Sequence, residues 1–316
     1  MPIEEAKLGD VAALIARQQR RARERSPVVP DALAHPAVAE ALLREFLAHG
    51  YIGRVAIASD APVGVLMGRP DGSSASLPAA GFSMAASSPD PTRLLAELYG
   101  DLAPALLERG ARRHYLSHLD IPATVQAVTD LGFARMAYCA IRPVGVLPHR
   151  VPERRGVEVR EGSADDLEVV ARLCMVEIDY RYVSPIYSPR PTHEATMDEV
   201  IESHRRLERN GGAHLIATLD GEDVGVLTLD MTNDAPGLCP HDQPFLGETA
   251  TVAHARGRGV GSALVEAAVQ WAAERNHPGL TVSFQPANRT SRRFWLGAGF
   301  EPTGFWTVRT IPESYV

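Results

Sequence analysis

The residues best suited to chemistry lie in a glycine-rich run, RGRGVGS, at residues 256–262 of the 316-residue chain. Its three glycines leave no side chains over the turn, so that successive backbone N–H groups can converge on an anion. Its two arginines add positive charge. A single helix terminus favours an anion by only about 0.3–1 kcal/mol, or up to about 2 kcal/mol when partly buried, so several donors must act together. The run therefore predicts a binding site for the phosphates of an anionic cofactor.

The spacing of the glycines argues against the two commonest phosphate-binding loops. A nucleoside-triphosphate loop requires a Lys directly before Ser262, and the chain has none there. A dinucleotide fingerprint requires a glycine five positions after Gly257, where Ser262 stands. The pattern that fits is [QR]-x-x-G-x-[GA], formed by Arg256, Gly259 and Gly261.

Regular secondary structure on both sides of the run would hold it in place. Residues Gly247 to Val252 are typical of a strand, and Ser262 to about Asn276 of an amphipathic helix with apolar side chains three and four positions apart. A second strand is predicted at Leu280 to Gln285, and a short helix from about Arg289 to Leu296. The turn is therefore expected directly after a strand, at the positive end of a helix dipole.

The stretch from Phe245 to Thr307 resembles the Gcn5-related N-acetyltransferase (GNAT) superfamily. Beside the turn, the resemblance rests on Asn288, Ser291, Phe294-Trp295 and Gly299-Phe300. It implies an α/β (α+β) fold, in which a mixed, mostly antiparallel sheet is flanked by helices. It also implies acetyl-CoA, or another acyl-CoA, as the co-substrate, without a metal.

The resemblance assigns parts of the cofactor to parts of the chain. The pyrophosphate would lie on the turn, and the pantetheine arm along the strand that ends near Val252, which would splay from the next strand to admit it. A backbone N–H of residues 251–253 would polarise the thioester carbonyl, a donor typically worth about 3 kcal/mol. Asn288 would approach the cofactor, cap the helix that follows it, or do both. The implied cofactor-binding residues are Thr251, Val252, Ala253, Arg256, Gly257, Arg258, Gly259, Val260, Gly261, Ser262, Asn288, Ser291 and Phe294.

Transfer to an amine requires a group that accepts a proton. An amine with a pKa near 10 is mostly protonated at neutral pH, and freeing its lone pair costs roughly 4 kcal/mol. Glu248 is the carboxylate inside the predicted strand that is close enough to accept this proton, directly or through water. The alternatives to Glu248 are Asp230, His241, Asp242 and His254, of which His241 and Asp242 lie in a loop, residues 231–244, that is long enough to line an acceptor pocket.

The proton donor to the departing thiolate is less clearly marked. Members of the GNAT superfamily often have a Tyr where this sequence has Trp295, and an indole N–H cannot act as an acid. Trp295 is therefore expected to pack in the core or against the cofactor. The proton would come from water or from Ser291, Tyr180, Tyr182 or Tyr187. The aromatic and proline-rich segment 178–193 is expected to form either a pocket wall or a packed surface loop.

The two halves of the sequence echo each other, which predicts an internal duplication. Val63-Gly-Val-Leu66 matches Val224-Gly-Val-Leu227, and Gly132-Phe133 matches Gly299-Phe300. We expect a degenerate GNAT-like domain at residues 1–145, a linker at 146–156 and a GNAT domain with the acyl-CoA site at 157–316. Where the second half has its glycine turn, the first has SSPDPTR at 87–93, in which proline lacks an N–H and Asp90 would repel phosphate. The first half is therefore expected not to bind CoA.

Composition sets the broad class of the protein. A hydrophobic content of 45% and a charged content of 22% are typical of soluble globular proteins. No apolar run reaches the ~18 residues of a membrane span, and the acidic start lacks a signal peptide's apolar core, so we expect a cytoplasmic protein. The three cysteines are expected to be reduced thiols, and His114 and His118 are expected not to bind metal. A net charge of −7 argues against nucleic acid or an anionic membrane as partner.

These observations together predict a function. The chain is expected to be an N-acetyltransferase that moves an acetyl or other acyl group from acyl-CoA directly to a primary amine of a small metabolite or peptide, as a monomer or homodimer. Two alternatives stay open: a non-catalytic acyl-CoA-binding or scaffold protein, and an O-acyltransferase on the same fold, because a fold does not determine its chemistry.

Overall fold

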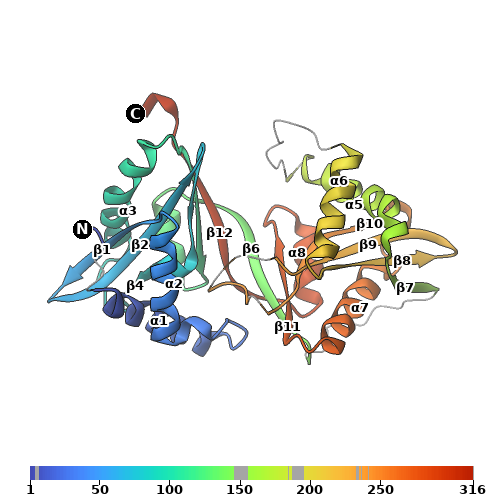
Figure 1. Cartoon of the computed structure of the whole chain (residues 1–316), viewed down its shortest axis with the longest axis horizontal. Coiled ribbons are helices and arrows are strands. Elements are labelled where there is room, and N and C mark those ends of the chain that lie inside the picture. Colours follow the sequence, from blue (N-terminus) through green and yellow to red (C-terminus); the bar gives the residue numbers. More distant parts are fainter. Residues whose placement is uncertain are drawn as a thin grey trace. The chain divides into compact units, whose positions relative to one another are not determined.

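The structure of the chain is a computed structural model, shown in Figure 1. It describes residues 1–3, 7–145, 156–183, 185–186, 196–232, 235, 237–240 and 242–315. Of the predicted linker at residues 146–156, all but Gly156 lies outside the described residues.

The two halves of the sequence fold into similar successions of elements, except that the second half opens with an additional strand and the first half has four strands, not three, between its second and third helices. The first half contains α1 (Leu8–Arg25), α2 (Pro36–Ala48), β1 (Ile52–Ala58), β2 (Ala61–Asp71), β3 (Ser74–Leu77), β4 (Phe82–Met84), α3 (Pro91–Leu107), β5 (Arg113–Leu119), α4 (Pro122–Asp130) and β6 (Ala134–Pro143). The second half contains β7 (Val157–Glu161), α5 (Leu167–Arg181), α6 (Met197–Arg209), β8 (Ala213–Leu219), β9 (Glu222–Asp230), β10 (Phe245–Thr251), α7 (Val260–Glu274), β11 (Gly279–Phe284), α8 (Arg289–Gly297) and β12 (Glu301–Thr310). This repeat of elements is what the predicted duplication requires.

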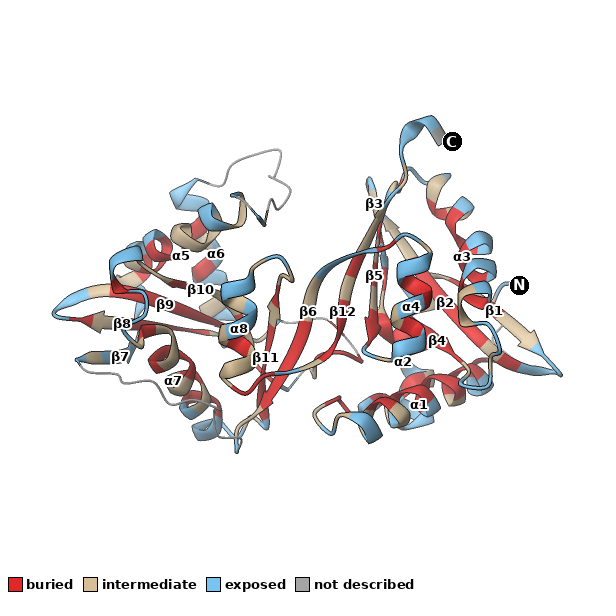
Figure 2. Cartoon of the chain, turned by 180° about the vertical axis from the view of Figure 1, so that it is seen from behind, coloured by how far each residue is buried: buried red, intermediate tan, exposed pale blue. Residues whose placement is uncertain are grey.

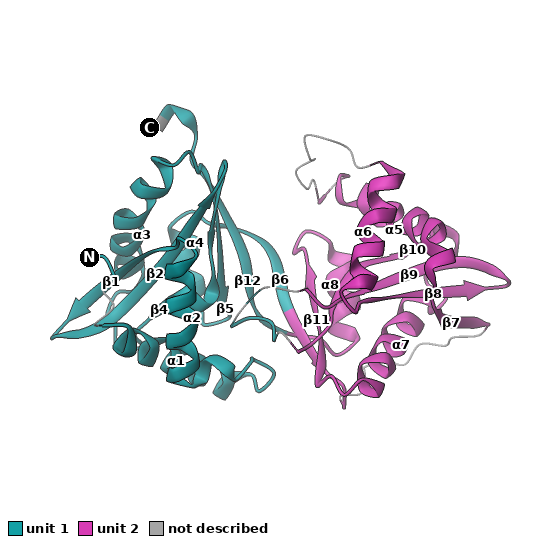
Figure 3. Ribbon diagram, viewed as in Figure 1, with its two compact units in different colours: residues 1–139, 235–240, 302–316 teal, residues 140–234, 241–301 magenta. Residues whose placement is uncertain are grey.

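Contacts divide the chain into two compact units that do not coincide with its halves (Figure 3). Unit 1 comprises residues 1–139, 235–240 and 302–316, and unit 2 comprises residues 140–234 and 241–301. The strand order is β1-β2-β3-β5-β12-β6 in unit 1, and the end of β6 begins the order β6-β11-β10-β9-β8-β7 in unit 2. Pairs β1/β2, β5/β12, β7/β8, β8/β9 and β9/β10 are antiparallel, whereas β3/β5 and β10/β11 are parallel.

The last strands of the two halves are exchanged. β12 pairs with β5 of the first half, from Gly304 opposite Leu119 to Thr310 opposite Arg113, and the end of β6 lies beside β11. The predicted boundaries, 1–145 and 157–316, therefore differ from the observed units at residues 140–145, 235–240 and 302–316. The reason is that a strand belongs to the sheet whose backbone groups it hydrogen-bonds, whatever its place in the sequence.

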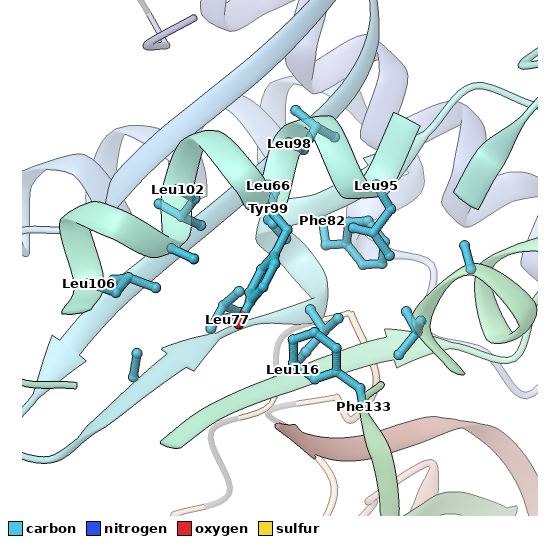
Figure 4. Close-up of a cluster of buried hydrophobic side chains, with 14 of the residues drawn as sticks. Leu66, Leu77, Phe82, Leu95, Leu98, Tyr99, Leu102, Leu106, Leu116 and Phe133 are labelled. Carbon is cyan, nitrogen blue, oxygen red and sulfur yellow. The ribbon is translucent and has the colours of Figure 1, made fainter. Parts of the chain in front are cut away.

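The core of unit 1 lies beneath α3 (Figure 4). Leucines at helical spacing along this helix are almost fully buried, namely Leu95, Leu98, Leu102 and Leu106. They share one cluster with Phe82 of β4, Leu77 of β3 and Leu116 of β5. Burying a leucine side chain stabilises a fold by roughly 1.5–3 kcal/mol, so this row is a main source of the stability of unit 1.

A second buried cluster of unit 1 joins segments that are distant in sequence. Cys139 of β6 and Cys239 are both buried, and their Sγ atoms lie 2.7 Å apart. Thr303 of β12 donates its hydroxyl hydrogen to the carbonyls of Cys139, at 3.3 Å, and Leu238, at 3.2 Å. All three cysteines are free thiols. The hydrogen bond with Cys239 and burial raise the pKa of the Cys139 thiol well above its usual range.

Helices cover both faces of the sheet in unit 2. Val170, Leu173 and Cys174 of α5 form one cluster with Val226 of β9. The neighbouring Gly225 faces α7, where a Cβ at this position would lie 2.7 Å from Val260 Cγ1. Successive strand residues point to opposite faces, so α5 and α7 cover opposite sides, and each buries the side that faces the sheet (Figure 2). Gly225 thus allows the start of α7 to approach β9 closely.

Candidate active site

The glycine turn lies between β10 and α7 of unit 2. Gly257 and Gly259 have φ angles of 78° and 85°, in the left-handed region that favours glycine. Gly259 is the N-cap of α7, and no side chain caps this helix. The N–H groups of the first helical residues, 260–262, have no carbonyl of the helix to bind. The turn therefore presents backbone donors at the positive end of the helix, a suitable place for phosphate oxygens.

Both arginines of the turn have partners within unit 2. The Nε–H of Arg256 donates to the carbonyl of Thr251 at 3.1 Å, and its guanidinium lies 5.5 Å from the centre of the Tyr180 ring. Arg258 forms an ion pair with Asp220, in which Nη2 and Oδ2 are 3.0 Å apart. Both side chains of this pair are largely exposed, so Arg258 can exchange Asp220 for a ligand at little cost.

A hollow of about 320 Å³ lies on α8 and is lined by Arg289, Thr290, Arg293 and Phe294. Phe294 joins this hollow to the start of α7, because a Cβ at Gly261 would lie 3.2 Å from Phe294 Cζ. Gly261 therefore leaves room for the Phe294 ring. Arg289 and Arg293 are not among the site residues predicted from the sequence, although their spacing of four places them on one face of a helix.

Asn288 caps α8, which is one of the two roles that the sequence predicts for it. Its Oδ1 accepts a hydrogen bond from the Ser291 N–H at 3.0 Å. The carboxamide nitrogen of Asn288 still offers two donors. Trp295 is buried and packs edge-on against Phe294 and Phe300, so the prediction that it packs in the core is confirmed.

The strands β10 and β11 pair only where β10 begins. In these two fully described strands the parallel register joins Phe245 to Thr281 and Leu246 to Val282, and none of the later residues of β10 pairs with β11. The edge of β10 from Gly247 to Thr251 is therefore free of a strand partner on the β11 side, as expected for two strands that splay to admit a ligand. Residues 251–253, the predicted oxyanion donors, lie at the end of this edge.

The alternation of backbone groups distinguishes between these donors. The Val252 N–H donates to the Val224 carbonyl of the β9 hairpin at 2.9 Å, so it is already bound. Successive N–H groups of a strand point to opposite edges, so the Thr251 N–H faces the side from which β11 has separated. Ala253 is exposed and begins a single-turn helix, residues 253–255. Of the two strand-end N–H groups, Thr251 and not Val252 is the one that faces the unpaired edge.

Glu248 lies at an irregularity of β10, where the register with β9 shifts between Leu246 and Thr249. The Thr228 hydroxyl donates to its Oε2 at 3.2 Å. Arg181 of α5 lies 3.6 Å from its Oε1, and the Glu248 side chain keeps 32% of its surface exposed. The carboxylate is thus held on one side and remains open to water on the other.

The titratable groups around Glu248 are mostly neutral. Burial lowers the pKa of His214 on β8 to about 4, although the Glu248 charge opposes this shift. Burial and the neighbouring His214 lower the pKa of His204 on α6, again against Glu248. Burial, with Glu248 adding to it, raises the pKa of the Cys174 thiol far above its usual range. Arg181 is therefore the main positive charge that faces this carboxylate.

The other candidate bases are placed less favourably. Asp230 ends β9, and its Oδ1 accepts hydrogen bonds of 2.7 Å from both the N–H and the hydroxyl of Thr232. Asp242 is exposed, and the exposed His254 lies 3.3 Å from Glu222. Of the tyrosines, Tyr180 lies beside Arg256 and Tyr182 ends α5. His241, Tyr187 and most of the segment after residue 186 lie outside the described residues.

The loop at residues 231–244, which the sequence predicts to be long enough to line an acceptor pocket, is divided between the two units, because its residues 235–240 belong to unit 1. Leu238 and Cys239 are buried in a cluster with Cys139, because apolar side chains in the middle of the loop are more stable in a core than beside a solvated site.

The first half has a different helix start at the corresponding place. Asp90 is the N-cap of α3, and its Oδ1 accepts a hydrogen bond from the Arg93 N–H at 2.9 Å. Pro91 follows as the first helical residue. One donor of this helix terminus is therefore bound by a carboxylate and another is missing, whereas the start of α7 is bare.

Within the described part of the chain, no three His, Cys, Asp or Glu side chains are grouped so that they could hold a metal ion. No helix among the described residues is long and apolar enough to span a membrane.

Comparisons with known proteins agree with this geometry. The model of the acetyltransferase (GNAT) family matches residues 180–300. A GCN5-related N-acetyltransferase from Sphaerobacter thermophilus is 15% identical, with a TM-score of 0.60 over 97% of this chain and 93% of that one. A tandem GNAT protein from the clavulanic acid biosynthesis pathway is 14% identical, with a TM-score of 0.53 over 98% of this chain and 96% of that one. No curated protein matches the sequence.

At such low identity the two solved structures are evidence of a shared fold alone. The family match rests on the sequence, and the residues it covers, 180–300, include the glycine turn. The predicted fold class, two tandem GNAT-like domains with mostly antiparallel sheets flanked by helices, is confirmed. Residues 180–300 therefore match the acetyltransferase (GNAT) family, and the chain as a whole has the fold of tandem GNAT proteins.

Proposed function

We propose that the chain is an N-acyltransferase that moves an acetyl group from acetyl-CoA directly to a primary amine of a small metabolite or peptide. The observation that supports this most is the bare glycine turn at the start of α7, beside the unpaired edge of β10. An acyl-CoA would use both features, since its pyrophosphate could bind the N–H groups of the turn and its pantetheine arm could lie along the strand edge.

The chain's own residues fit such a co-substrate. A side chain at Gly259 would be strained at its φ of 85°, and one at Gly261 would press on Phe294. Backbone N–H groups of residues 257–262 would hold the pyrophosphate, and Arg289 and Arg293 offer positive charge to a further phosphate. Asn288 and Ser291 lie at the start of the same helix. Acetyl-CoA would supply an activated acyl group, and residues of the protein would bind it and accept the proton.

Two groups are assigned roles in the transfer. Glu248 takes the proton from the attacking amine, directly or through water, because its carboxylate is partly exposed and lies on the strand with the unpaired edge. The Thr251 N–H donates to the carbonyl oxygen that gains negative charge, and such a donor typically contributes about 3 kcal/mol. The first half, with Asp90 capping α3, is proposed to bind no CoA.

The test is turnover by the full chain with acetyl-CoA and a panel of primary amines, measured as release of the CoA thiol and as product mass. We expect an N-acetyl product. Binding of CoA without release of thiol for any amine would favour the non-catalytic alternative, and an ester product would favour O-acylation.

The role of Glu248 is tested by Glu248→Gln, which keeps the shape of the side chain and removes its basicity. The rate at pH 7 should fall about 10²–10⁴-fold, and CoA affinity should stay nearly unchanged. Glu168→Gln is the matched control, because it makes the same change at an exposed carboxylate of α5 that is not a candidate base. Equal rates for Glu248→Gln and wild type at pH 7 would move the search to Asp230, His241 and Asp242.

A further inference from the structure

Thr228 is a polar residue in an otherwise apolar part of β9. Its neighbours Val226, Leu227 and Leu229 are fully buried, and Thr228 has no exposed surface either. A buried hydroxyl requires a partner, since leaving it unbound costs about 1–3 kcal/mol. Val has the same shape as Thr and would avoid this cost, so the hydroxyl at position 228 calls for an explanation.

The hydroxyl of Thr228 binds the proposed proton acceptor. It donates to Glu248 Oε2 at 3.2 Å, across the place where the register of β9 and β10 shifts. Arg181 lies 3.6 Å from the other carboxylate oxygen, and its own Nε–H donates to Glu177 at 2.7 Å. Each oxygen of Glu248 therefore faces one donor, and the two donors come from different elements, β9 and α5.

Gly247 makes room for this hydroxyl. A Cβ built at Gly247 would lie 2.5 Å from Thr228 Oγ1, closer than real contacts allow. Any other residue at position 247 would displace the hydroxyl that supports the next residue of the chain. The pair Gly247-Glu248 and the buried Thr228 thus form one arrangement, in which glycine, threonine and glutamate depend on one another.

We infer that Thr228 is a positioning residue for the transfer reaction, whose buried hydroxyl holds the Glu248 carboxylate in one orientation at the register shift of β10. This inference rests on the proposed role of Glu248 as the proton acceptor. The hydroxyl also stabilises the ionised carboxylate, as do hydrogen-bond donors to charged groups generally. The other titratable or charged groups that face this carboxylate are Arg181, Cys174, His204 and His214, with Glu177 behind Arg181.

Thr228→Val removes the donor and keeps the shape. The acidic limb of the kcat/KM profile should move to higher pH by about one unit, because a donor to the charged form has been lost. At a pH on this limb the rate should fall about tenfold, with the CoA dissociation constant unchanged. Thr228→Ser retains the hydroxyl and should restore the wild-type profile. If Thr228→Val does not fold, Thr228→Ala replaces it in the test. Thr228→Ala also removes the donor, and unlike Val it places no additional methyl group beside the carboxylate.

A second measurement does not depend on turnover. In protein labelled with ¹³C at the glutamate carboxyls, the Glu248 signal is the one lost in Glu248→Gln, and its titration midpoint should move to higher pH in Thr228→Val. If the wild-type protein acetylates no amine, the proposed function is wrong. The titration still shows whether the Thr228 hydroxyl stabilises the Glu248 carboxylate. If the pH profile and the titration of Thr228→Val both match wild type, or if Ser does not restore them, Thr228 is only a core residue.

Discussion

The guanidinium Nη1 of Arg142 lies 2.9 Å from the carboxylate Oε1 of Glu266 on α7. Arg142 is the last residue but one of β6, in the first half of the sequence, and only 1% of its side chain is exposed. The N–H of Val144, two residues later, donates to the Pro278 carbonyl at 3.1 Å. Unit 2, which contains the glycine turn, therefore includes residues 140–145 from the end of the first half of the sequence. Its other elements all come from the second half.

We predict that residues 150–316 expressed alone are insoluble or poorly stable. The fragment lacks the end of β6 beside β11, and its β12 lacks β5, so each sheet edge would expose unpaired backbone groups. Co-expression with residues 1–149 should restore a soluble complex. Arg142→Met in the full chain is a milder version of the same change and should destabilise unit 2 by about 3 kcal/mol, since it leaves a partly buried carboxylate unpaired. A stable, active 150–316 fragment would refute the exchange of strands.

We predict one CoA per chain, bound at the turn of unit 2. Gly259→Glu should weaken CoA binding at least about 100-fold, because it adds strain at a positive φ and a like charge beside the phosphates. Gly211→Glu is the matched control, because it adds the same charge and the same strain, at a φ of 84°, between α6 and β8 and outside the glycine turn. Calorimetric titration measures both affinity and stoichiometry. Two equivalents of CoA would mean that the first half binds as well.

We predict that the arginines of the hollow on α8 contribute to CoA affinity. Arg289→Ala and Arg293→Ala should each raise the CoA dissociation constant about tenfold at low salt, and by less at high salt, where exposed charges are screened. Arg292→Ala on the same helix is the control, because Arg292 does not line the hollow. Equal effects of all three substitutions would indicate a general charge effect and not a site.

We predict that Cys139 and Cys239 form a disulfide on exposure to hydrogen peroxide, in which two thiols lose two hydrogens and the peroxide is reduced to water. Their Sγ atoms are in contact, while Cys174 lies in a different cluster of unit 2. After oxidation and unfolding, an alkylating reagent should label one cysteine in wild type and none in Cys174→Ser. The high pKa of the Cys139 thiol should make the reaction slow. Three labelled cysteines after prolonged oxidation would contradict this prediction.

We predict that stability falls as pH drops from about 6.5 to about 4. Burial lowers the pKa of His118 and of His214 to about 4, whereas an unfolded histidine titrates near 6.5. Between these values the unfolded chain binds more protons, so acid favours unfolding, by on the order of 3 kcal/mol for each ring across the whole interval. Above pH 6.5 this contribution is fully present. Melting temperatures at pH 7 and pH 5 measure the effect.

The control for this acid sensitivity is a pair of substitutions. His118→Asn keeps a donor where the ring Nδ1 lies 3.0 Å from the Leu119 carbonyl, and it should reduce the loss of stability at low pH. His49→Asn changes an exposed ring and should leave the pH dependence as in wild type. A pH dependence that is unchanged in His118→Asn would mean that other groups, such as carboxylates, cause the loss.

Much of the fold and the conformation of the glycine turn could be predicted from the sequence, because these features depend on local backbone chemistry. Helices and strands follow from the periodicity of apolar residues, and they lie within a few residues of the predicted ranges. The turn at 256–262 follows from glycines that permit positive φ, and two of them adopt it. The start of α7, which has no side-chain cap among the described residues, also follows from the local sequence. The same holds for the start of α3 in the first half, where Asp90 is the cap and Pro91 follows.

Only the tertiary structure decided which strands pair and which side chains surround Glu248. β12 has a similar pattern whether it pairs with β5 or β11, so periodicity cannot reveal that the last strands of the two halves are exchanged. Thr228 and Arg181 are 20 and 67 positions before Glu248, and their roles depend on register and on helix packing. The same holds for Cys139 and Cys239, which are 100 residues apart and in contact. Local sequence determines backbone conformation, whereas contacts between distant residues arise only when the sheets assemble and their cores are packed.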